Sequence, residues 1–185
     1  YFTKEAYALM KRLGFKNFLG RFNEEESQGE SSFSKKFKKV TEKAEAEKVF
    51  SEAITAGKAG FFRLSTGIAL CYNAENVYFI DTDCMPEEET AEHMLTLSEK
   101  AEISVCDIKK QYGILAKDGT EHYFDILIAA YLLNPLKNDY DTESIAGEHL
   151  GLMIPGRTEV FGKKTEEAVY AENPAKVTEY ACYGA

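Results

Sequence analysis

The sequence predicts an α/β fold with a mixed β-sheet flanked by helices. Three short apolar segments follow one another with short connections, which is typical of an antiparallel meander: Gly60–Leu64, Gly67–Tyr72 and Val77–Ile80. A further apolar segment, Ile103–Cys106, follows a helical pattern, and more helical patterns come after it. Three strands, a helix, another strand and then helices indicate an α/β arrangement rather than a bundle or a sandwich.

The composition is that of one globular domain. Of the 185 residues, 44% are hydrophobic and 12% aromatic, which is enough for a sizeable core. The net charge of −9 argues against an autonomous nucleic-acid binder, because phosphate contacts need a concentrated basic face. The basic run Lys35–Lys39 is interpreted as a solvated segment.

Neither a membrane span nor a zinc site is predicted. The longest apolar stretch, Ile126–Leu133, is far shorter than the roughly 20 residues that cross a bilayer. No secretory signal is visible, so we expect a cytoplasmic protein with free thiols. The cysteines form no C-x-x-C pair and the histidines show no metal-ligand spacing: Cys71, Cys84, Cys106, Cys182, His93, His122 and His149.

The chain divides into three parts. Residues 1–22 are predicted to form an amphipathic helix, and its pattern is already under way at Tyr1, as in a piece of a longer protein. Residues 23–36 are polar and without periodicity, which indicates a flexible linker. Residues 37–185 form the main body.

The first helix of the main body is predicted to begin at a Thr41 cap and to end at Ala56, before Gly57. Its inward-facing apolar positions are predicted to be Ala44, Val49, Phe50 and Ile54.

Four further helices are indicated by their caps and breaks. Pro86 opens one that carries three glutamates at its positive end and runs to Lys100. Asp107 is predicted to cap a helix through Ala116, and Asp125 another through Leu133. Asp141 begins one that ends before Gly151.

The last part of the chain has weaker signals. Helical periodicity resumes near Thr165 and breaks at Pro174. The segment Pro155–Thr158 is interpreted as a surface turn, since it lacks the G-K-(S/T) of a phosphate loop. The spacing of Tyr123, Phe124 and Tyr131 predicts that these rings are buried in the core rather than stacked on bases.

The segment Tyr123–Pro135 (YFDILIAAYLLNP) resembles a helix of the 3′–5′ exonuclease domain of bacterial family A DNA polymerases of the polymerase I type. Tyr140–Ala146 and His149–Gly151 continue the resemblance, and Gly113–Gly119 and Asn76–Ile80 extend it upstream. It covers roughly residues 35–185 and implies a ribonuclease H-like fold. Residues 1–22 would then be the tail of the connection from the 5′-nuclease domain.

Active members of this family hydrolyse DNA with two divalent ions, held by four acids from three segments and assisted by a tyrosine. Here the resemblance places Arg63 and Ser65 at the first two acids and Gln111 at the third. Tyr180 matches the tyrosine, but Gly184 stands at the fourth acid. At about 4 Å and an effective dielectric of 20, an arginine repels a dication by roughly 8 kcal/mol.

The resemblance therefore implies a degenerate domain without catalytic, cofactor-binding or metal-binding residues. It would be a structural module between the 5′-nuclease and polymerase domains of the same chain. Magnesium would serve the parent polymerase, which synthesises DNA on a template in replication and repair. DNA would be bound through the parent, and weakly or not at all by this domain alone.

Two alternatives remain open. One is an active metal-dependent 3′–5′ exonuclease that uses relocated carboxylates, Asp81, Asp83 and Asp107, although acids after a strand and before Pro86 are also common turn chemistry. The other is an acidic protein-interaction module unrelated to polymerases. Asp125 is interpreted as a helix cap rather than as a catalytic acid.

Overall fold

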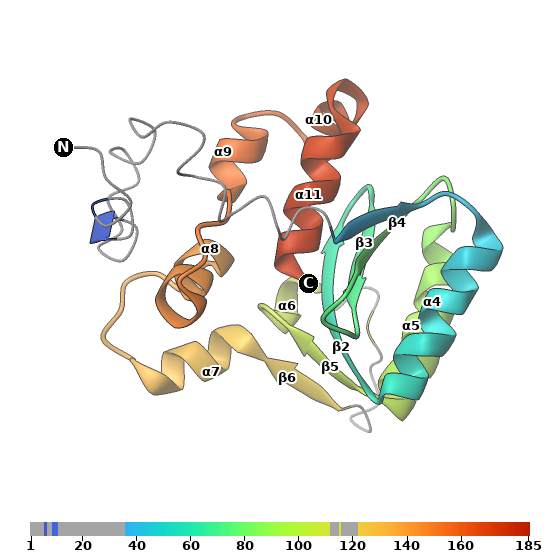
Figure 1. The fold of residues 1–185 in the computed structure, drawn as a ribbon, viewed down its shortest axis with the longest axis horizontal. Coiled ribbons are helices and arrows are strands. Elements are labelled where there is room, and N and C mark those ends of the chain that lie inside the picture. The colour runs from blue at the N-terminus through green and yellow to red at the C-terminus, as the bar shows by residue number, and fades with distance from the viewer. Residues whose placement is uncertain (1–5, 7–8, 11–35, 112–114, 116–121) are drawn as a thin grey trace.

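The fold is built on one six-stranded mixed sheet, in the order β1-β4-β3-β2-β5-β6 (Figure 1). The computed structural model describes residues 6, 9–10, 36–111, 115 and 122–185. The strands are β1 (Phe37–Val40), β2 (Lys58–Leu64), β3 (Gly67–Cys71), β4 (Val77–Asp81), β5 (Glu102–Val105) and β6 (Tyr123–Asp125). Only the pairs that involve β3 are antiparallel, so the other five strands end at the same edge of the sheet.

Helices cover both faces of this sheet. They are α4 (Lys43–Ala56), α5 (Glu87–Lys100), α6 (Ile108–Gln111), α7 (Ile126–Leu133), α8 (Thr142–Ile145), the π-helical turn η1 (Ala146–Leu150), α9 (Arg157–Phe161), α10 (Glu166–Glu172) and α11 (Pro174–Gly184). Figure 1 shows α4 and α5 on one face and α11 on the other, while α7 extends from β6 at the far edge. None of the described helices is long and apolar enough to cross a bilayer.

The two helical layers enclose two hydrophobic cores. On β2, Phe61 packs into the core beneath α4 and α5, with Phe50 and Met94. Its neighbour Phe62 points to the opposite face and packs into the core beneath α11, with Val177. Successive strand residues face opposite sides, so a central strand between two layers is apolar at consecutive positions.

The antiparallel meander predicted from the sequence is confirmed as β2, β3 and β4. The αL helix end at Gly57 is also confirmed, with φ of 74°. Two strands were missed. The basic run interpreted as a solvated segment overlaps β1, an edge strand whose Lys38 and Lys39 are exposed while Val40 is buried. The other is β6, which is only three residues long.

Some local predictions were wrong. The first helix begins at Lys43 after Glu42, so Thr41 does not cap it. Ala44 is exposed, because the buried stripe runs through Ala46, Val49, Phe50 and Ala53 at helical spacing. The segment interpreted as a surface turn leads directly into α9.

The four cysteines are free thiols as predicted, although only Cys106 and Cys182 are buried. Residues 1–22 and 23–36, predicted to be a helix and a linker, lie outside the described residues except for residues 6, 9, 10 and 36. The predicted helix from Asp107 to Ala116 is described only as far as Gln111 and at Leu115.

Candidate functional site

A cavity of about 590 Å³ opens where β2 and β5 end, beside α6 and α11. Sheets of this kind commonly bind ligands at the carboxyl ends of their strands. Arg63, Ser65, Gln111 and Tyr180 all line this cavity. Gly184 lies in an adjoining small pocket that also includes Tyr180. The five positions that the sequence identified from three distant segments therefore meet at one place.

Arg63 lies near the end of β2 and directs its guanidinium to the start of α5. There it forms an ion pair with Glu87, and its side chain is 25% exposed. The positive charge of Arg63 thus lies at the rim of the cavity, and its partner Glu87 is the first residue of α5.

Ser65 lines the cavity and is tied by its backbone to α10. Its N–H donates to Oε2 of Glu166 over 2.7 Å. The other oxygen of Glu166 accepts from Arg157 over 2.6 Å, and this pairing raises the pKa of Arg157. Both oxygens of this carboxylate are therefore engaged by the protein.

Gln111, the last residue of α6, is 5% exposed. Its Oε1 has no hydrogen-bond partner among the described residues. The side chain places an uncharged amide in the wall of the cavity, where an acid would place a negative charge.

Tyr180 packs edge-on against Phe62 and Phe161, with ring centroids 5.6 and 5.2 Å away. Burial raises the pKa of this phenol to about 12, so it is neutral at neutral pH. One helical turn later, a Cβ at Gly184 would overlap the Phe62 ring. The side chain of Phe62 thus fills the space that an acid at residue 184 would need.

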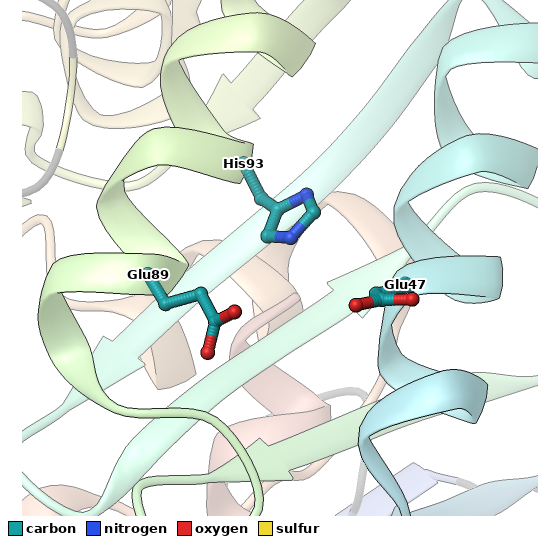
Figure 2. A group of neighbouring side chains, drawn as sticks. All are labelled: Glu47, Glu89 and His93. Atoms are coloured by element: carbon teal, nitrogen blue, oxygen red, sulfur yellow. The ribbon is translucent and has the colours of Figure 1, made fainter.

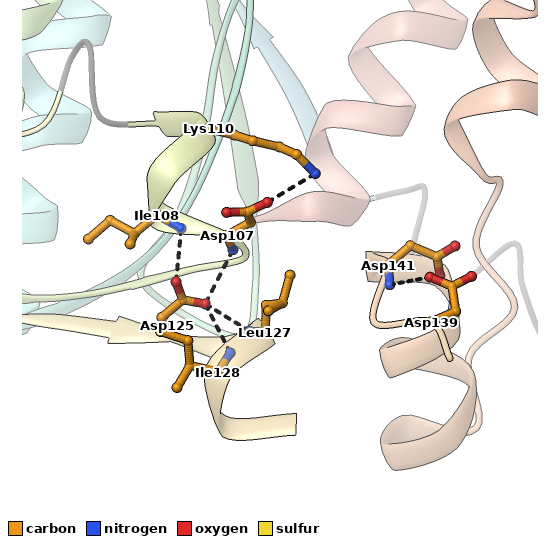
Figure 3. A network of polar contacts seen from close by, with 8 residues as sticks. All are labelled: Asp107, Ile108, Lys110, Asp125, Leu127, Ile128, Asp139 and Asp141. Carbon is orange, nitrogen blue, oxygen red and sulfur yellow. Dashed lines mark hydrogen bonds and ion pairs between the residues drawn. The ribbon is translucent and has the colours of Figure 1, made fainter. Parts of the chain in front are cut away.

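Asp125 ties two helix starts together at the edge of the cavity (Figure 3). Its carboxylate accepts from the N–H groups of Leu127 and Ile128 in the first turn of α7, at 2.9 and 3.3 Å. It also accepts from the N–H groups of Asp107 and Ile108, at 3.3 and 2.9 Å. The prediction of a cap is confirmed, and the same carboxylate supports α6 as well.

Asp107 stands directly before α6, as predicted, but its side chain has a different role. It adopts a positive φ of 60°, which is uncommon for any residue but glycine. Its carboxylate pairs with Lys110 at 3.0 Å, while Asp125 accepts from the N–H of Ile108. The predicted capping of α6 by Asp107 is therefore taken over by Asp125.

Asp81 is buried at the end of β4, and its carboxylate is held by an ion pair and two hydrogen bonds. It pairs with Lys39 at 2.7 Å and accepts from the Tyr170 hydroxyl at 2.9 Å and the Cys84 N–H at 2.8 Å. Burial by itself would raise the pKa of Asp81, but these hydrogen bonds outweigh burial and lower it.

The structure does not assemble the relocated carboxylates into one site. The strand order places β3 and β2 between Asp81 on β4 and Asp107 after β5, and Asp83 is exposed in the turn after β4. Within the described ranges, three metal-capable side chains with ligand atoms within 4.8 Å of one another occur only at Glu47, Glu89 and His93. That group lies between α4 and α5, not in the cavity.

Sequence reasoning missed both Glu166 and the Glu47, Glu89 and His93 group. No sequence signal links Glu166 to Ser65, because about a hundred residues separate them. For the second group a signal did exist: Glu89 and His93 are four residues apart on one helix and so share a face.

The family described as "DNA polymerase I, ribonuclease H-like domain" matches residues 63–183. DNA polymerase I of Bacillus subtilis (strain 168) is 29% identical over 180 residues, which are 92% of this chain and 20% of that protein. The chain therefore spans about a fifth of the length of this relative.

Solved structures share the fold. The Nibbler EXO domain of Aedes aegypti has a TM-score of 0.58 at 10% identity, covering 80% of this chain and 81% of that one. RNase D of Trypanosoma brucei, in its GMP complex, has a TM-score of 0.58 at 11% identity, covering 83% and 56%. The predicted α/β fold of ribonuclease H-like type is confirmed.

Proposed function

The chain belongs to the ribonuclease H-like domain family of DNA polymerase I, and we propose that it is an exonuclease-like domain that has lost catalysis. It acts as a structural module of a parent polymerase that synthesises DNA on a template, with magnesium, in replication and repair. Residues 37–185 form this module, residues 1–22 end the connection from a 5′-nuclease domain, and residues 23–36 link the two. The parent works in the cytoplasm of a bacterium.

The proposal rests on the side chains that the cavity offers as possible metal ligands. Two divalent ions need several anionic oxygens close together. At the positions of the family's acids the cavity offers Arg63 and the amide of Gln111, and a glycine stands at residue 184 in the adjoining pocket. The residues at these positions do not fit a pair of magnesium ions.

Among the described residues, four acids line the cavity: Asp107, Asp141, Glu143 and Glu166. Asp107 is paired with Lys110, Glu166 with Arg157 and the Ser65 N–H, and Asp141 accepts from the Ser144 N–H at the start of α8. A dication at Asp107 or Glu166 would first have to displace a cation. This arrangement favours a wall held together by internal ion pairs over a metal site.

A nuclease assay tests the loss of catalysis. The chain is incubated with 5′-labelled single-stranded DNA and Mg²⁺ or Mn²⁺, with an active 3′–5′ exonuclease on the same DNA as the positive control. We expect no metal-dependent shortening of the labelled strand from its 3′ end above background. Metal-dependent shortening that a carboxylate substitution abolishes would refute the proposal, and loss of that activity in Asp107→Asn would support the nuclease that uses relocated carboxylates.

The exposed apolar side of α7 supports the structural role. The exposed apolar side chains of α7, of Phe124 just before it and of Leu136 just after it are 49–91% exposed. We call them the α7 surface: Phe124, Ile128, Tyr131, Leu132, Leu133 and Leu136. The prediction that Phe124 and Tyr131 are buried in the core of this domain was wrong. The inner side of α7 packs on its own small core, through Ala130.

A helix that is apolar on all sides is normally buried on all sides, and contiguous exposed apolar patches mark interaction surfaces. Because the chain spans about a fifth of its polymerase relative, the remaining parts of the parent supply the covering surface in this proposal. We assign that role to the polymerase domain of the same chain. Family membership and the mixed sheet disfavour the alternative of an acidic interaction module unrelated to polymerases.

A further inference from the structure

Three metal-capable side chains converge between α4 and α5, on the opposite side of the sheet from α11 (Figures 1 and 2). Glu47 comes from α4, and Glu89 and His93 come from adjacent turns of α5. One ligand atom from each lies within 4.8 Å of the others. Metal–ligand bonds of about 2.0–2.2 Å allow a single ion to bridge atoms spaced in this way after small side-chain adjustments.

The imidazole of His93 is held in place by the core. Its ring stacks on Phe50, with centroids 4.9 Å apart and planes at 17°. Phe50 is 1% exposed, so the stacking partner is itself fixed. Figure 2 shows the His93 ring directed into the gap between the two helices, where the carboxylates of Glu47 and Glu89 also point. A ligand that is already oriented loses little conformational freedom when it binds.

A cation already occupies part of this gap. The ammonium group of Lys43 forms an ion pair with Glu89, and the hydrogen bond from this pairing raises the pKa of Lys43. The Lys43 side chain is 53% exposed, and exposed pairs of this kind contribute little to stability. A divalent ion can therefore displace Lys43 at small cost.

We propose that Glu47, Glu89 and His93 bind a late first-row divalent cation such as Zn²⁺, with water completing the coordination. One imidazole and two carboxylates suit Zn²⁺, Co²⁺ or Ni²⁺, whereas Mg²⁺ prefers oxygen ligands alone. The bound ion clamps α4 to α5 and stabilises the layer that covers this face of the sheet. The site is independent of the cavity and of the proposed loss of nuclease activity.

Calorimetric titration of the chain with ZnCl₂, together with thermal unfolding with and without Zn²⁺, tests the site. We expect one ion per chain and a higher Tm in its presence, because a ligand of the folded state stabilises it. His93→Gln should weaken binding by about tenfold or more, since loss of even an outer partner of a metal ligand costs that much. Lys43→Ala should strengthen binding, because it removes the competing ammonium group.

Two matched variants separate this site from general acidity and from binding by another imidazole. Glu92→Gln removes the same charge as Glu89→Gln from an exposed position on the same helix, and His149→Gln removes an imidazole elsewhere. Both should bind Zn²⁺ like the unaltered chain, while Glu89→Gln should not. Equal binding by His93→Gln and the unaltered chain would overturn the proposal, as would absence of binding at millimolar Zn²⁺.

Discussion

The ring of Phe62 occupies the space that a side chain at Gly184 would need, so α11 can lie against β2 only because residue 184 is a glycine. Alanine normally favours a helix over glycine by about 1 kcal/mol. Overpacking a filled core costs about 1–3 kcal/mol. Gly184→Ala should therefore lower the free energy of unfolding, as measured by urea titration.

The control is Gly184→Ala in a chain that also carries Phe62→Leu. In a Phe62→Leu chain the overlap is relieved, and Gly184→Ala should become neutral or stabilising. If the alanine destabilises both backgrounds equally, the ring is not the cause. Gly184→Asp, which introduces the larger acid, should be more destabilising than alanine in the Phe62 background.

Asp125→Ala should lower the free energy of unfolding by about 2–3 kcal/mol, because it removes an ionised acceptor of four backbone N–H groups. Asp125→Asn should cost less, since one amide oxygen still accepts. Asp139→Ala is a suitable comparison, because Asp139 accepts only one exposed N–H, that of Asp141, in the described structure (Figure 3). A similar loss in both alanine variants would contradict the double-capping role.

The stability of the domain should depend on the ionisation of Asp81. The pKa of this carboxyl is lowered in the folded state from an ordinary value of 3.8. Its contribution is therefore fully present above that ordinary value and is lost as the pH falls through the lower, folded value. We expect the free energy of unfolding to decline below about pH 4 and Asp81→Asn to flatten that decline.

Urea titrations at several pH values between neutral and about pH 2 measure this effect. Asp83→Asn removes the same charge from an exposed neighbour that lacks these partners. If Asp83→Asn flattens the decline as much as Asp81→Asn, the hydrogen bonds to Lys39 and Tyr170 do not control it.

Replacing two leucines of the α7 surface should leave the isolated domain intact. Leu132 and Leu133 are each 73% exposed, so Leu132→Lys with Leu133→Lys should change the free energy of unfolding by only about 0.5 kcal/mol per site. Binding of a hydrophobic dye should fall. In the parent polymerase the same pair should lower the Tm, because the proposed polymerase contact would bury these side chains. An unchanged Tm in the parent would contradict the docking role.

Ala130→Lys is the matched control on the inner side of α7, where residue 130 is buried. It should destabilise the isolated domain strongly, because a lysine there is forced into the small core with Ile145 and Cys106.

Sequence reasoning predicted those elements of the fold whose ends are marked by nearby residues in the chain. Turn residues separate β2, β3 and β4, and Gly57 ends α4, so both could be placed from neighbouring residues alone. The strand β1 was missed because Lys38 and Lys39 face solvent at an edge, and only its parallel pairing with β4 makes it a strand. Such pairing depends on residues forty positions away.

In the candidate site, too, some residues could be predicted from the sequence and some contacts could not. Arg63, Gln111 and Tyr180 were placed at one site by resemblance to a family, and the structure brings them into one cavity. The bond from Ser65 to Glu166 has no counterpart in the sequence, because it depends on how α10 packs. Phe124 and Tyr131 were assigned to the core from their spacing, but spacing identifies only a shared face and not what covers it.

The carboxylate of Asp125 accepts hydrogen bonds from backbone N–H groups at the start of α7 and at the start of α6. A domain that packs on the α7 surface would therefore also restrict the motion of the cavity rim at Asp107 and Gln111. The proposed contact with the parent polymerase would in this way also help to hold the shape of the cavity.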